Sequence, residues 1–261
     1  MGLKESGLRG SLRSVSTGVV AIPDSVVENL DHWWPIDEGE GSSITDGIKD
    51  NTASFAGSPT WVSRSGFVGG FGLDMDGDTD GWDTSLNLSG TDWNITGWVE
   101  LGSRFAQRSV IFGCGTSDLL GNVNVDGDGI LITYGTDPSD SEDGGLAMGM
   151  TDGGSFNLSG GGNEVAFDIP EGETVFFSAN FDTSDDEFEM FVYDDSNKIG
   201  DKTGDSDGRD FGTLSDPTFF SNYDNSDDRC SGHDGIEIAV GITNDRLPES
   251  DIEQIWEDTK P

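Results

Sequence analysis

The stretch from Gly66 to Asp83, GFVGGFGLDMDGDTDGWD, joins an apolar strand to a dense row of carboxylates. Apolar side chains and glycines are interleaved here, which is typical of a strand with bulges and close backbone approach. The apolar residues are Phe67, Val68, Phe71, Leu73 and Met75, and the glycines among them are Gly66, Gly69, Gly70 and Gly72. The chain then turns polar at once. We therefore expect a strand that runs into an acidic loop.

This acidic loop carries the start of a calcium-binding pattern. Asp76, Asp78, Asp80 and Gly81 read DxDxDG, in which alternate carboxylates face one hard cation and glycine allows a sharp turn. With Asp83 beside them, these aspartates are the candidate ligands of a Ca²⁺ ion. The loop lacks a glutamate at its twelfth position, and aspartate is abundant throughout the chain. A hydrated surface turn, or loosely held sodium or potassium, therefore stays open as an alternative.

The composition bounds the fold class. The chain has 261 residues, enough for one large core, and sandwiches of this size commonly form a single domain. Its 39 glycines and its short runs of valine, isoleucine, phenylalanine and tryptophan favour many short strands with tight turns. Seven tryptophans and 15 phenylalanines argue against an acidic disordered chain.

The charge balance is extreme. The chain has 51 Asp and Glu residues against 13 Lys and Arg residues, which gives a formal net charge of -38. At molar salt the Debye length falls to roughly 3 Å, so that self-repulsion is screened while the carboxylates keep the surface hydrated. We therefore expect a protein of an extremely halophilic archaeon or of its virus, and we expect no nucleic-acid partner.

The first 30 residues differ from the rest of the chain. They contain no aromatic side chain, but they carry Lys4, Arg9 and Arg13, three of the 13 basic residues. We expect residues 1–30 to form an anchoring arm that docks on carboxylates of an acidic particle, and a free, solvated tail is the alternative. The sequence contains neither a recognisable signal peptide nor an apolar stretch long enough to span a membrane, so membrane insertion is not expected.

Side-chain alternation predicts further strands and one helix. Asn94–Leu101 alternates as a strand does, and Ile169–Tyr193 reads as two alternating strands joined into a hairpin. Leu247–Asp258 instead has the spacing of an amphipathic helix. The apolar stripe of this helix consists of Ile252, Ile255 and Trp256. We expect the helix to lie against the sheets.

Together these segments resemble the laminin-G-like (LamG) family of the concanavalin-A-like lectin and glucanase superfamily. The matching segments, in the order of the family, are His32–Gly39 (HWWPIDEG), Asp50–Val62, Gly66–Asp83, Asn94–Leu101, Ile169–Tyr193, Gly235–Gly241 (GIEIAVG) and Leu247–Asp258 (LPESDIEQIWED). The resemblance implies an all-β concanavalin-A-like (LamG) jelly-roll β-sandwich over residues 31–261. It also implies a short C-terminal helix, and the sandwich would follow an extended N-terminal arm.

Two features limit what this resemblance implies. Phe176 and Phe177 stand where relatives have paired histidines, so no role that depends on those histidines is carried over. The chain has two cysteines, Cys114 and Cys230. A late cysteine before the terminal strand forms a bridge in relatives, but two separate thiols are an equally open alternative.

Ligand and catalytic residues are sparse in this pattern. Trp82, Tyr134 and Tyr223 lie near expected loops and are the candidates for stacking on sugar rings, with core packing as the alternative. The carboxylates that could serve a glycoside hydrolase are Asp186, Glu187 and Glu189. Their spacing does not match the glucanase EXDXXE type, so we predict no catalytic residue and no enzyme.

These observations lead to a functional hypothesis. A lectin-like fold on a chain without a recognised export signal fits a virion protein, which is assembled in the host cytoplasm and released by lysis. We predict a non-catalytic protein of the virion surface, a capsid spike or tail-associated subunit of a halophilic archaeal virus. Its arm would bind other virion proteins, its sandwich would bind host glycan or S-layer, and it would form a homo-oligomer. The alternatives are a glycoside hydrolase and a cellular carbohydrate-binding module.

Overall fold

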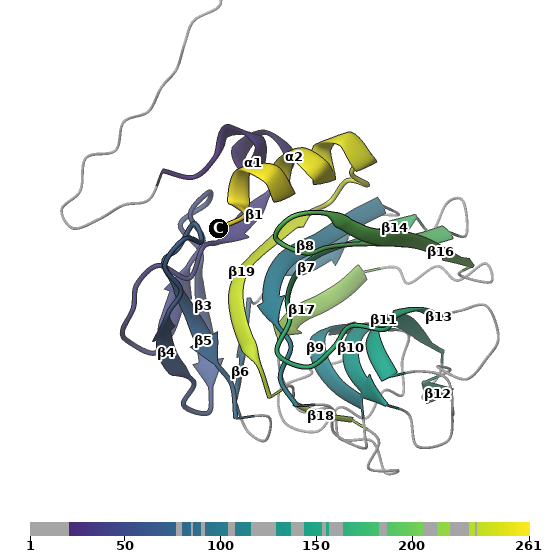
Figure 1. The fold of residues 1–261 in the computed structure, drawn as a ribbon, viewed down its shortest axis with the longest axis horizontal. Helices are drawn as coiled ribbons and strands as arrows, with labels where there is room; N and C mark the ends of the chain where they lie inside the picture. Colours follow the sequence, from purple (N-terminus) through teal and green to yellow (C-terminus); the bar gives the residue numbers. More distant parts are fainter. Residues whose placement is uncertain are drawn as a thin grey trace, which may run out of the picture.

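The fold is a β-sandwich, seen here in a computed structural model. The described residues are 21–76, 80–84, 86–89, 92–103, 108–115, 129–136, 144–152, 155–156, 164–182, 187–205, 213–219, 230–232 and 234–261. Within them the strands form two sheets that face each other, and two helices lie on the outer face of one sheet (Figure 1). The predicted all-β jelly roll with a short C-terminal helix is confirmed.

The helix-covered sheet, which we call sheet A, is antiparallel. Its strands are, in spatial order, β16 (Lys198–Asp205), β15 (Glu187–Tyr193), β14 (Thr174–Asp182), β8 (Asp92–Glu100), β19 (Ile236–Thr243), β5 (Phe71–Asp74) and β4 (Thr60–Ser63), with β1 (His32–Trp34) paired to β19. Both predicted alternating segments are central here, because β8 pairs with β14 and β14 pairs with β15.

The opposing sheet, sheet B, contains the remaining strands. They are, in spatial order, β12 (Ser155–Phe156), β11 (Gly144–Asp152), β10 (Gly129–Thr136), β9 (Arg108–Gly115), β17 (Thr213–Phe219), β6 (Gly81–Asp83), β3 (Thr52–Ala56) and β2 (Ser43–Thr45). Three further strands pair beside this path, β13 (Glu164–Phe167) with β11, β18 (Cys230–Gly232) with β9 and β7 (Asn87–Ser89) with β17.

The pairing of β18 with β9 separates the two cysteines. Its parallel register sets Cys230 opposite Arg108, six residues from Cys114 along β9. At about 3.3 Å per residue the two cysteine Cα atoms are roughly 20 Å apart, too far for a disulfide.

Sheet A is buried on both of its faces, which explains why its strands are so apolar. The inner face packs against sheet B, and the outer face packs against α1 (Asp24–Asn29) and α2 (Glu249–Thr259). The outer layer contains Trp98, Phe176, Phe191 and Tyr193 of sheet A and the predicted stripe Ile252, Ile255 and Trp256 of α2. Burial on both faces turns the expected alternation of β8 into a continuous buried run.

The glycine-rich entry to β5 is a close approach between backbones. A Cβ atom on Gly69 would lie 1.6 Å from the carbonyl oxygen of Pro35, so that no other residue fits there without moving the backbone. Gly66 and Gly70 adopt positive φ angles of 111° and 75°, in the turn that precedes the strand. The stretch that suggested the fold therefore serves the packing of β5 against the segment after β1.

The beginning of the described chain belongs to the packed body. In α1, Val26 is fully buried, and Leu30 after it is 5% exposed, both within the outer apolar layer under the helices. The residues from α1 onward therefore help to cover sheet A, whereas an arm that ends at residue 30 was expected. Residues 1–20, with Lys4, Arg9 and Arg13, lie outside the described residues.

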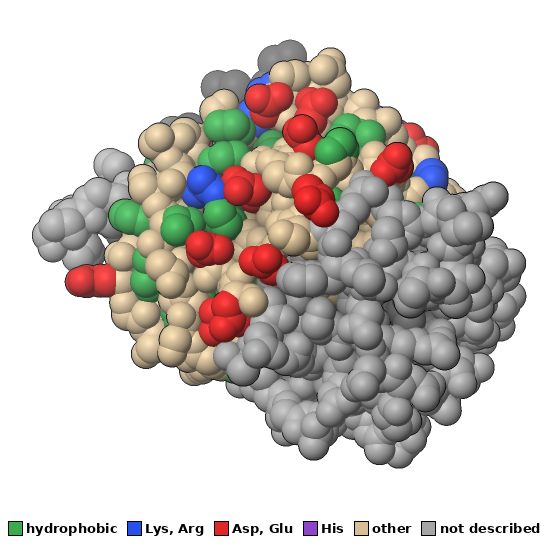
Figure 2. Space-filling model, turned by 60° about the horizontal axis from the view of Figure 1, so that its bottom comes forward, with side chains coloured by type: hydrophobic (Ala, Val, Ile, Leu, Met, Phe, Trp, Pro, Cys, Tyr) green, Lys and Arg blue, Asp and Glu red, His purple; other side chains and the backbone are tan. Residues whose placement is uncertain are grey.

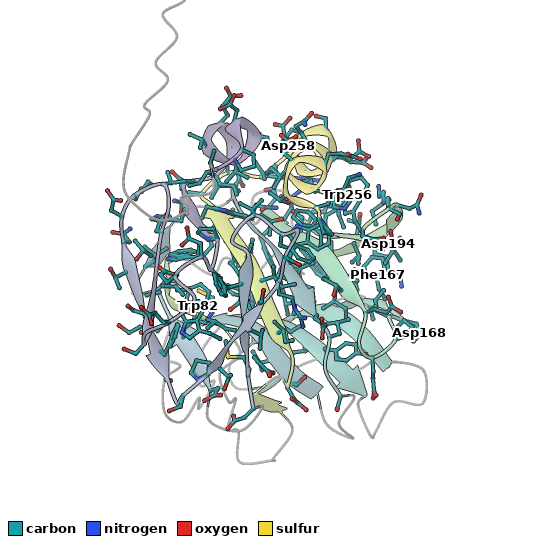
Figure 3. All side chains as sticks on the ribbon, turned by 60° about the vertical axis from the view of Figure 1, so that its left-hand side comes forward. Trp82, Phe167, Asp168, Asp194, Trp256 and Asp258 are labelled. Atoms are coloured by element: carbon teal, nitrogen blue, oxygen red, sulfur yellow. The ribbon has the colours of Figure 1, made fainter. Side chains whose placement is uncertain are left out.

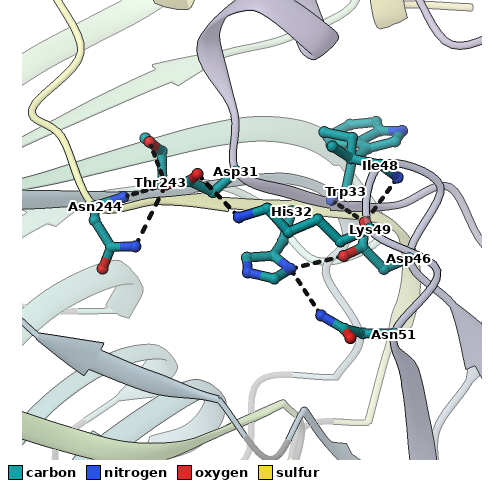
Figure 4. Close-up of polar contacts among 9 residues, drawn as sticks. All are labelled: Asp31, His32, Trp33, Asp46, Ile48, Lys49, Asn51, Thr243 and Asn244. Carbon is teal, nitrogen blue, oxygen red and sulfur yellow. Dashed lines mark hydrogen bonds and ion pairs between the residues drawn. The ribbon is translucent and has the colours of Figure 1, made fainter.

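A buried carboxylate fastens β1 to the turn at residues 46–51. Asp46 is fully buried, and its Oδ2 lies 2.6 Å from His32 Nδ1 (Figure 4). Its Oδ1 accepts hydrogen bonds from the backbone N–H groups of Trp33 at 3.0 Å and Ile48 at 2.9 Å. Burial raises the pKa of Asp46, but these hydrogen bonds, above all that with His32, bring it below its usual value. His32 therefore has a structural role, in which it holds the turn against β1.

Replacing this carboxylate should weaken the fold. We expect Asp46→Asn to lower the free energy of unfolding by about 2 kcal/mol, because it removes charge-assisted hydrogen bonds in a buried site. The exposed Asp24→Asn on α1 is the matched control and should change it by less than about 0.5 kcal/mol. Denaturant unfolding at molar KCl measures both values, and equal stability of the two variants would contradict the prediction.

Candidate functional site

The outer face of sheet A changes from apolar to acidic beyond the helices. In β15, Phe188 and Met190 point into the core, which leaves Glu187 and Glu189 on the outer face. Register pairing places Asp182 of β14 directly opposite Glu187. Like charges that face each other across strands destabilise a sheet unless a counter-charge joins them.

Arg246, in the connection between β19 and α2, supplies that counter-charge. Its Nη1 lies 3.2 Å from Glu187 Oε2 and 3.7 Å from Asp182 Oδ2, and its Nη2 lies 3.1 Å from Glu189 Oε2. Burial lowers the pKa of Arg246, but the hydrogen bond and charge of Glu189, followed by those of Glu187, raise it above its ordinary value. The guanidinium therefore stays charged and joins three carboxylates from two strands.

Asn180 fixes the segment that carries Arg246. Its Nδ2 donates to the carbonyl oxygen of Leu247 at 2.8 Å, and the Leu247 N–H donates back to its Oδ1 at 3.0 Å. Asn94 Nδ2 donates to the same Oδ1 at 2.9 Å and to Ser178 Oγ at 2.8 Å. All three polar side chains are at most 1% exposed. The position of Arg246 is thus set by buried hydrogen bonds and not only by its own ion pairs.

A hollow of about 420 Å³ opens beside this arginine. It is lined by Glu189, Phe191, Arg246, Leu247, Pro248 and Glu249. Lys198 of β16 pairs with Asp201 at 2.7 Å and with Glu249, and its Nζ lies 5.1 Å from the ring centroid of Phe191. Burial lowers the pKa of Lys198, but its hydrogen bonds with these two carboxylates raise it above its ordinary value. The hollow therefore combines the charged side chains of Glu189, Arg246 and Glu249 with the apolar groups of Phe191, Leu247 and Pro248.

The predicted calcium loop is described only at its two ends. Asp80 is 5% exposed, its Oδ1 accepts from Ser58 N–H at 2.6 Å, and it exchanges hydrogen bonds of 3.3 Å with Asp76. Asp83 lies beyond the loop in β6, and Asp78 is outside the described residues. Across the part of the chain that the structure describes, no three His, Cys, Asp or Glu side chains form a group that could hold a metal. Asp76 and Asp80 thus hold each other through their backbone N–H groups, and a Ca²⁺ site that includes Asp78 stays a prediction.

Two of the three aromatic residues that were candidates for sugar stacking are in the core. Trp82 and Tyr134 are both 0% exposed, and Trp82 lies inside the sandwich (Figure 3). Trp82 packs edge-on against Trp34, with 5.3 Å between the ring centroids. The Tyr134 hydroxyl donates a hydrogen bond of 3.0 Å to the carbonyl oxygen of Ile169. This is the packing alternative, and neither ring is accessible to a sugar. Tyr223 is outside the described residues.

Sequence reasoning missed the residues that organise the hollow. Glu187 and Glu189 were singled out as carboxylates, while Arg246, Lys198 and Asn180 were not, and Asp186 lies outside the described residues. The sequence does hold one indication, the small number of basic residues. With 13 Lys and Arg residues against 51 Asp and Glu residues, each basic side chain can find several carboxylates to pair with. Arg246, between the last strand and the C-terminal helix, could therefore have been predicted to join carboxylates.

The fold, but not the sequence, resembles known proteins. No protein-family model matches the chain, and no curated protein matches it either. A structure of Trypanosoma rangeli sialidase in complex with sialic acid is similar, with 13% sequence identity and a TM-score of 0.57. The match covers 90% of this chain and 33% of the sialidase chain. The enzymatically active domain of tailspike protein 2 of bacteriophage CBA120 matches 78% of this chain and 30% of its own, with 14% identity and a TM-score of 0.52. The fold is of the concanavalin-A-like, jelly-roll kind.

The match is therefore to part of larger proteins. The chain spans about a third of the length of the sialidase and tailspike chains, and identities of 13% and 14% show the fold alone. The VIP36 exoplasmic/lumenal domain, in a Ca²⁺/Man3GlcNAc-bound form, also matches 82% of this chain and 92% of its own, with 9% identity and a TM-score of 0.48.

These matches overturn one prediction. The chain was expected to be no enzyme, because its carboxylates lack the glucanase spacing. The structures that share its fold include a sialidase and the enzymatically active domain of a tailspike. The absence of one familiar spacing is therefore no ground for excluding catalysis, and the prediction of a non-enzyme is withdrawn.

None of the helices in the described ranges is long and apolar enough to cross a membrane.

Proposed function

We propose that the protein is a carbohydrate-recognition β-sandwich whose ligand binds in the hollow beside Arg246. The observation that carries the proposal is the hollow itself, where Glu189 and Arg246 lie 3.1 Å apart at the edge of an apolar floor. Sugars present hydroxyl groups and apolar C–H faces together, and sites with a few placed polar groups on an apolar surface bind such molecules. The sialidase bound to sialic acid and the tailspike support this proposal through their shared fold.

We also propose a location for this activity. The charge of -38 suits a protein of molar salt, and the tailspike has the same fold on a bacteriophage. A subunit of the virion surface of a halophilic archaeal virus, oligomeric and bound to other virion proteins, would present the sandwich to host glycan or S-layer. Mass spectrometry of purified particles and of host envelope fractions tests this location. Its presence in the envelope alone would favour a cellular carbohydrate-binding module.

A glycoside hydrolase is the second candidate function. It is favoured by the matched enzymes and by Glu187 and Glu189, two carboxylates that converge on Arg246, of which Glu189 lines the hollow. Incubation with a panel of oligosaccharides at molar KCl, followed by chromatography of the products, tests it. Turnover that is lost in Glu187→Gln and Glu189→Gln but kept in Glu100→Gln would establish hydrolysis here. Glu100 is a fair control because it pairs with Arg64 at 2.6 Å on the same sheet.

The proposed arm gives a prediction for two truncations. Removal of residues 1–20 should leave the sandwich folded while assembly into particles is lost, because α1 and the residues around it supply the described apolar cover of sheet A. Removal of residues 1–30 should also lower the free energy of unfolding, by about 2–5 kcal/mol, since the buried Val26 and Leu30 are lost with α1. Thermal melts and incorporation into particles measure the two effects. Normal incorporation of the shorter truncation would show that the arm is not the anchor.

A further inference from the structure

The charges around the hollow restrict the kind of sugar that it can take. The cations that the described residues place there, Arg246 and Lys198, are each in contact with at least two carboxylates. The carboxylates in these contacts are Asp182, Glu187, Glu189, Asp201 and Glu249. In these contacts five carboxylates surround two cations, so that each cation is already paired with negative charge.

The acidic row continues along the sheet. Asp92 of β8 lies opposite Asp182 in the register and on the same outer face, because both alternate with core residues. The Oδ1 atom of Asp92 is buried and has no hydrogen-bond partner among the described residues. A buried carboxylate oxygen is stabilised by a donor and destabilised by another anion. The outer face of sheet A is thus acidic from β8 across β14 to β15.

On this basis we propose that the hollow binds uncharged glycans and excludes sugars that carry a carboxylate, such as sialic and uronic acids. The inference rests on the proposed carbohydrate function and names the ligand class for the same hollow. Hydroxyl groups of a neutral sugar can donate to the remaining lone pairs of Glu187 and Glu189, and they can accept from the guanidinium, which has five N–H donors. A sugar carboxylate would instead lie in contact with these glutamates and be repelled by them. Salt screens this repulsion only in part, because the contact distance is no longer than the Debye length at molar salt, roughly 3 Å.

Cationic ligands fit the site less well than neutral ones. An ammonium group would have to share these carboxylates with Arg246, whose contacts with three carboxylates from β14 and β15 are reinforced by the buried Asn180 hydrogen bonds. It would also compete with monovalent cations at molar concentration. A neutral hydroxyl group has neither handicap, because it adds hydrogen bonds without replacing an ion pair.

The test compares matched neutral and acidic sugars. Binding of glucose oligosaccharides, galactose oligosaccharides, glucuronic acid oligosaccharides, galacturonic acid oligosaccharides and sialyl-lactose is measured by microarray and calorimetry at molar KCl with the full chain. We expect at least one neutral series to bind, and its acidic counterpart to bind at least about tenfold more weakly. Glu189→Gln should weaken neutral binding by about tenfold or more, whereas Glu100→Gln, its partner control on sheet A, should not.

Each result has a distinct meaning. Equal or tighter binding of the uronic acid or sialyl compounds would overturn the charge-exclusion proposal while leaving carbohydrate recognition in place. Neutral binding that survives unchanged in Glu189→Gln would place the ligand elsewhere and overturn the proposal as well. Binding of no sugar at all would refute the proposed function together with this inference. Thermal melts of both variants check that a loss of binding is not a loss of folding.

Discussion

Transfer from molar KCl to about 0.1 M salt is expected to unfold the protein or cause it to aggregate. The net charge is -38, and acidic side chains are spread over the described part of the face in Figure 2 with few basic ones among them. The Debye length grows from roughly 3 Å to about 10 Å over this range, so that neighbouring carboxylates begin to repel one another. A domain has only about 5–15 kcal/mol of stability in total, and we expect this repulsion to consume it.

Tryptophan fluorescence can follow this transition, because Trp33, Trp34, Trp82 and Trp98 are buried and would be exposed by unfolding. Melting temperatures across a series of KCl concentrations give the result. Sucrose, which does not screen charge, is the control and should fail to replace the salt. Acidification at low salt should restore part of the stability, since protonation removes the repulsion. A melting temperature that is the same in molar and 0.1 M salt would refute the prediction.

The sequence was most informative where a pattern is local. The hairpin of β14 and β15, the strand β8 and the apolar stripe of α2 all follow from spacing within short segments. The acidic loop is less certain, because DxDxDG describes residues that are near in sequence without showing where their oxygens point. In the structure, Asp80 closes the loop on Ser58, 22 residues away.

The candidate site depends on contacts that no local pattern contains. Arg246 meets Glu187 and Glu189 across 57 to 59 residues, and Asn180 meets Leu247 across 67. These pairs arise only after β14, β15 and β19 have taken their places in one sheet. Trp82 illustrates the same limit. Its position among aspartates was compatible with surface stacking or with core packing, and only the pairing of β6 with β3 shows that the ring is buried in the core.

A buried glutamic acid within the sandwich is the origin of the second large effect. Glu237 of β19 is 2% exposed, and its Oε2 accepts a hydrogen bond from the indole N–H of Trp82. A bulge between Glu237 and Ala239 shifts the register against β8, so that this side chain faces inward opposite Val99. Burial raises the pKa of Glu237 well above its ordinary value of 4.5, and the hydrogen bond from Trp82 offsets only part of that rise.

We therefore expect Glu237→Gln to stabilise the protein at neutral pH. Below pH 4.5 the acid is neutral in both states, so the stability that it provides is fully present there and the variant should match the wild type. Above that pH the unfolded chain ionises first, and the wild type loses about 1.4 kcal/mol per pH unit until the folded pKa is passed. Glutamine keeps an acceptor for Trp82 without this cost, so the melting temperature of the variant should rise above that of the wild type as the pH increases beyond 4.5. Melts of both proteins between pH 4 and 9 at constant molar KCl measure the difference, with the part-exposed Glu100→Gln as a control that should not gain stability. If the two curves stay parallel across that range, Glu237 is ionised in the fold, and its burial must be balanced by a cation or water at the Trp82 contact.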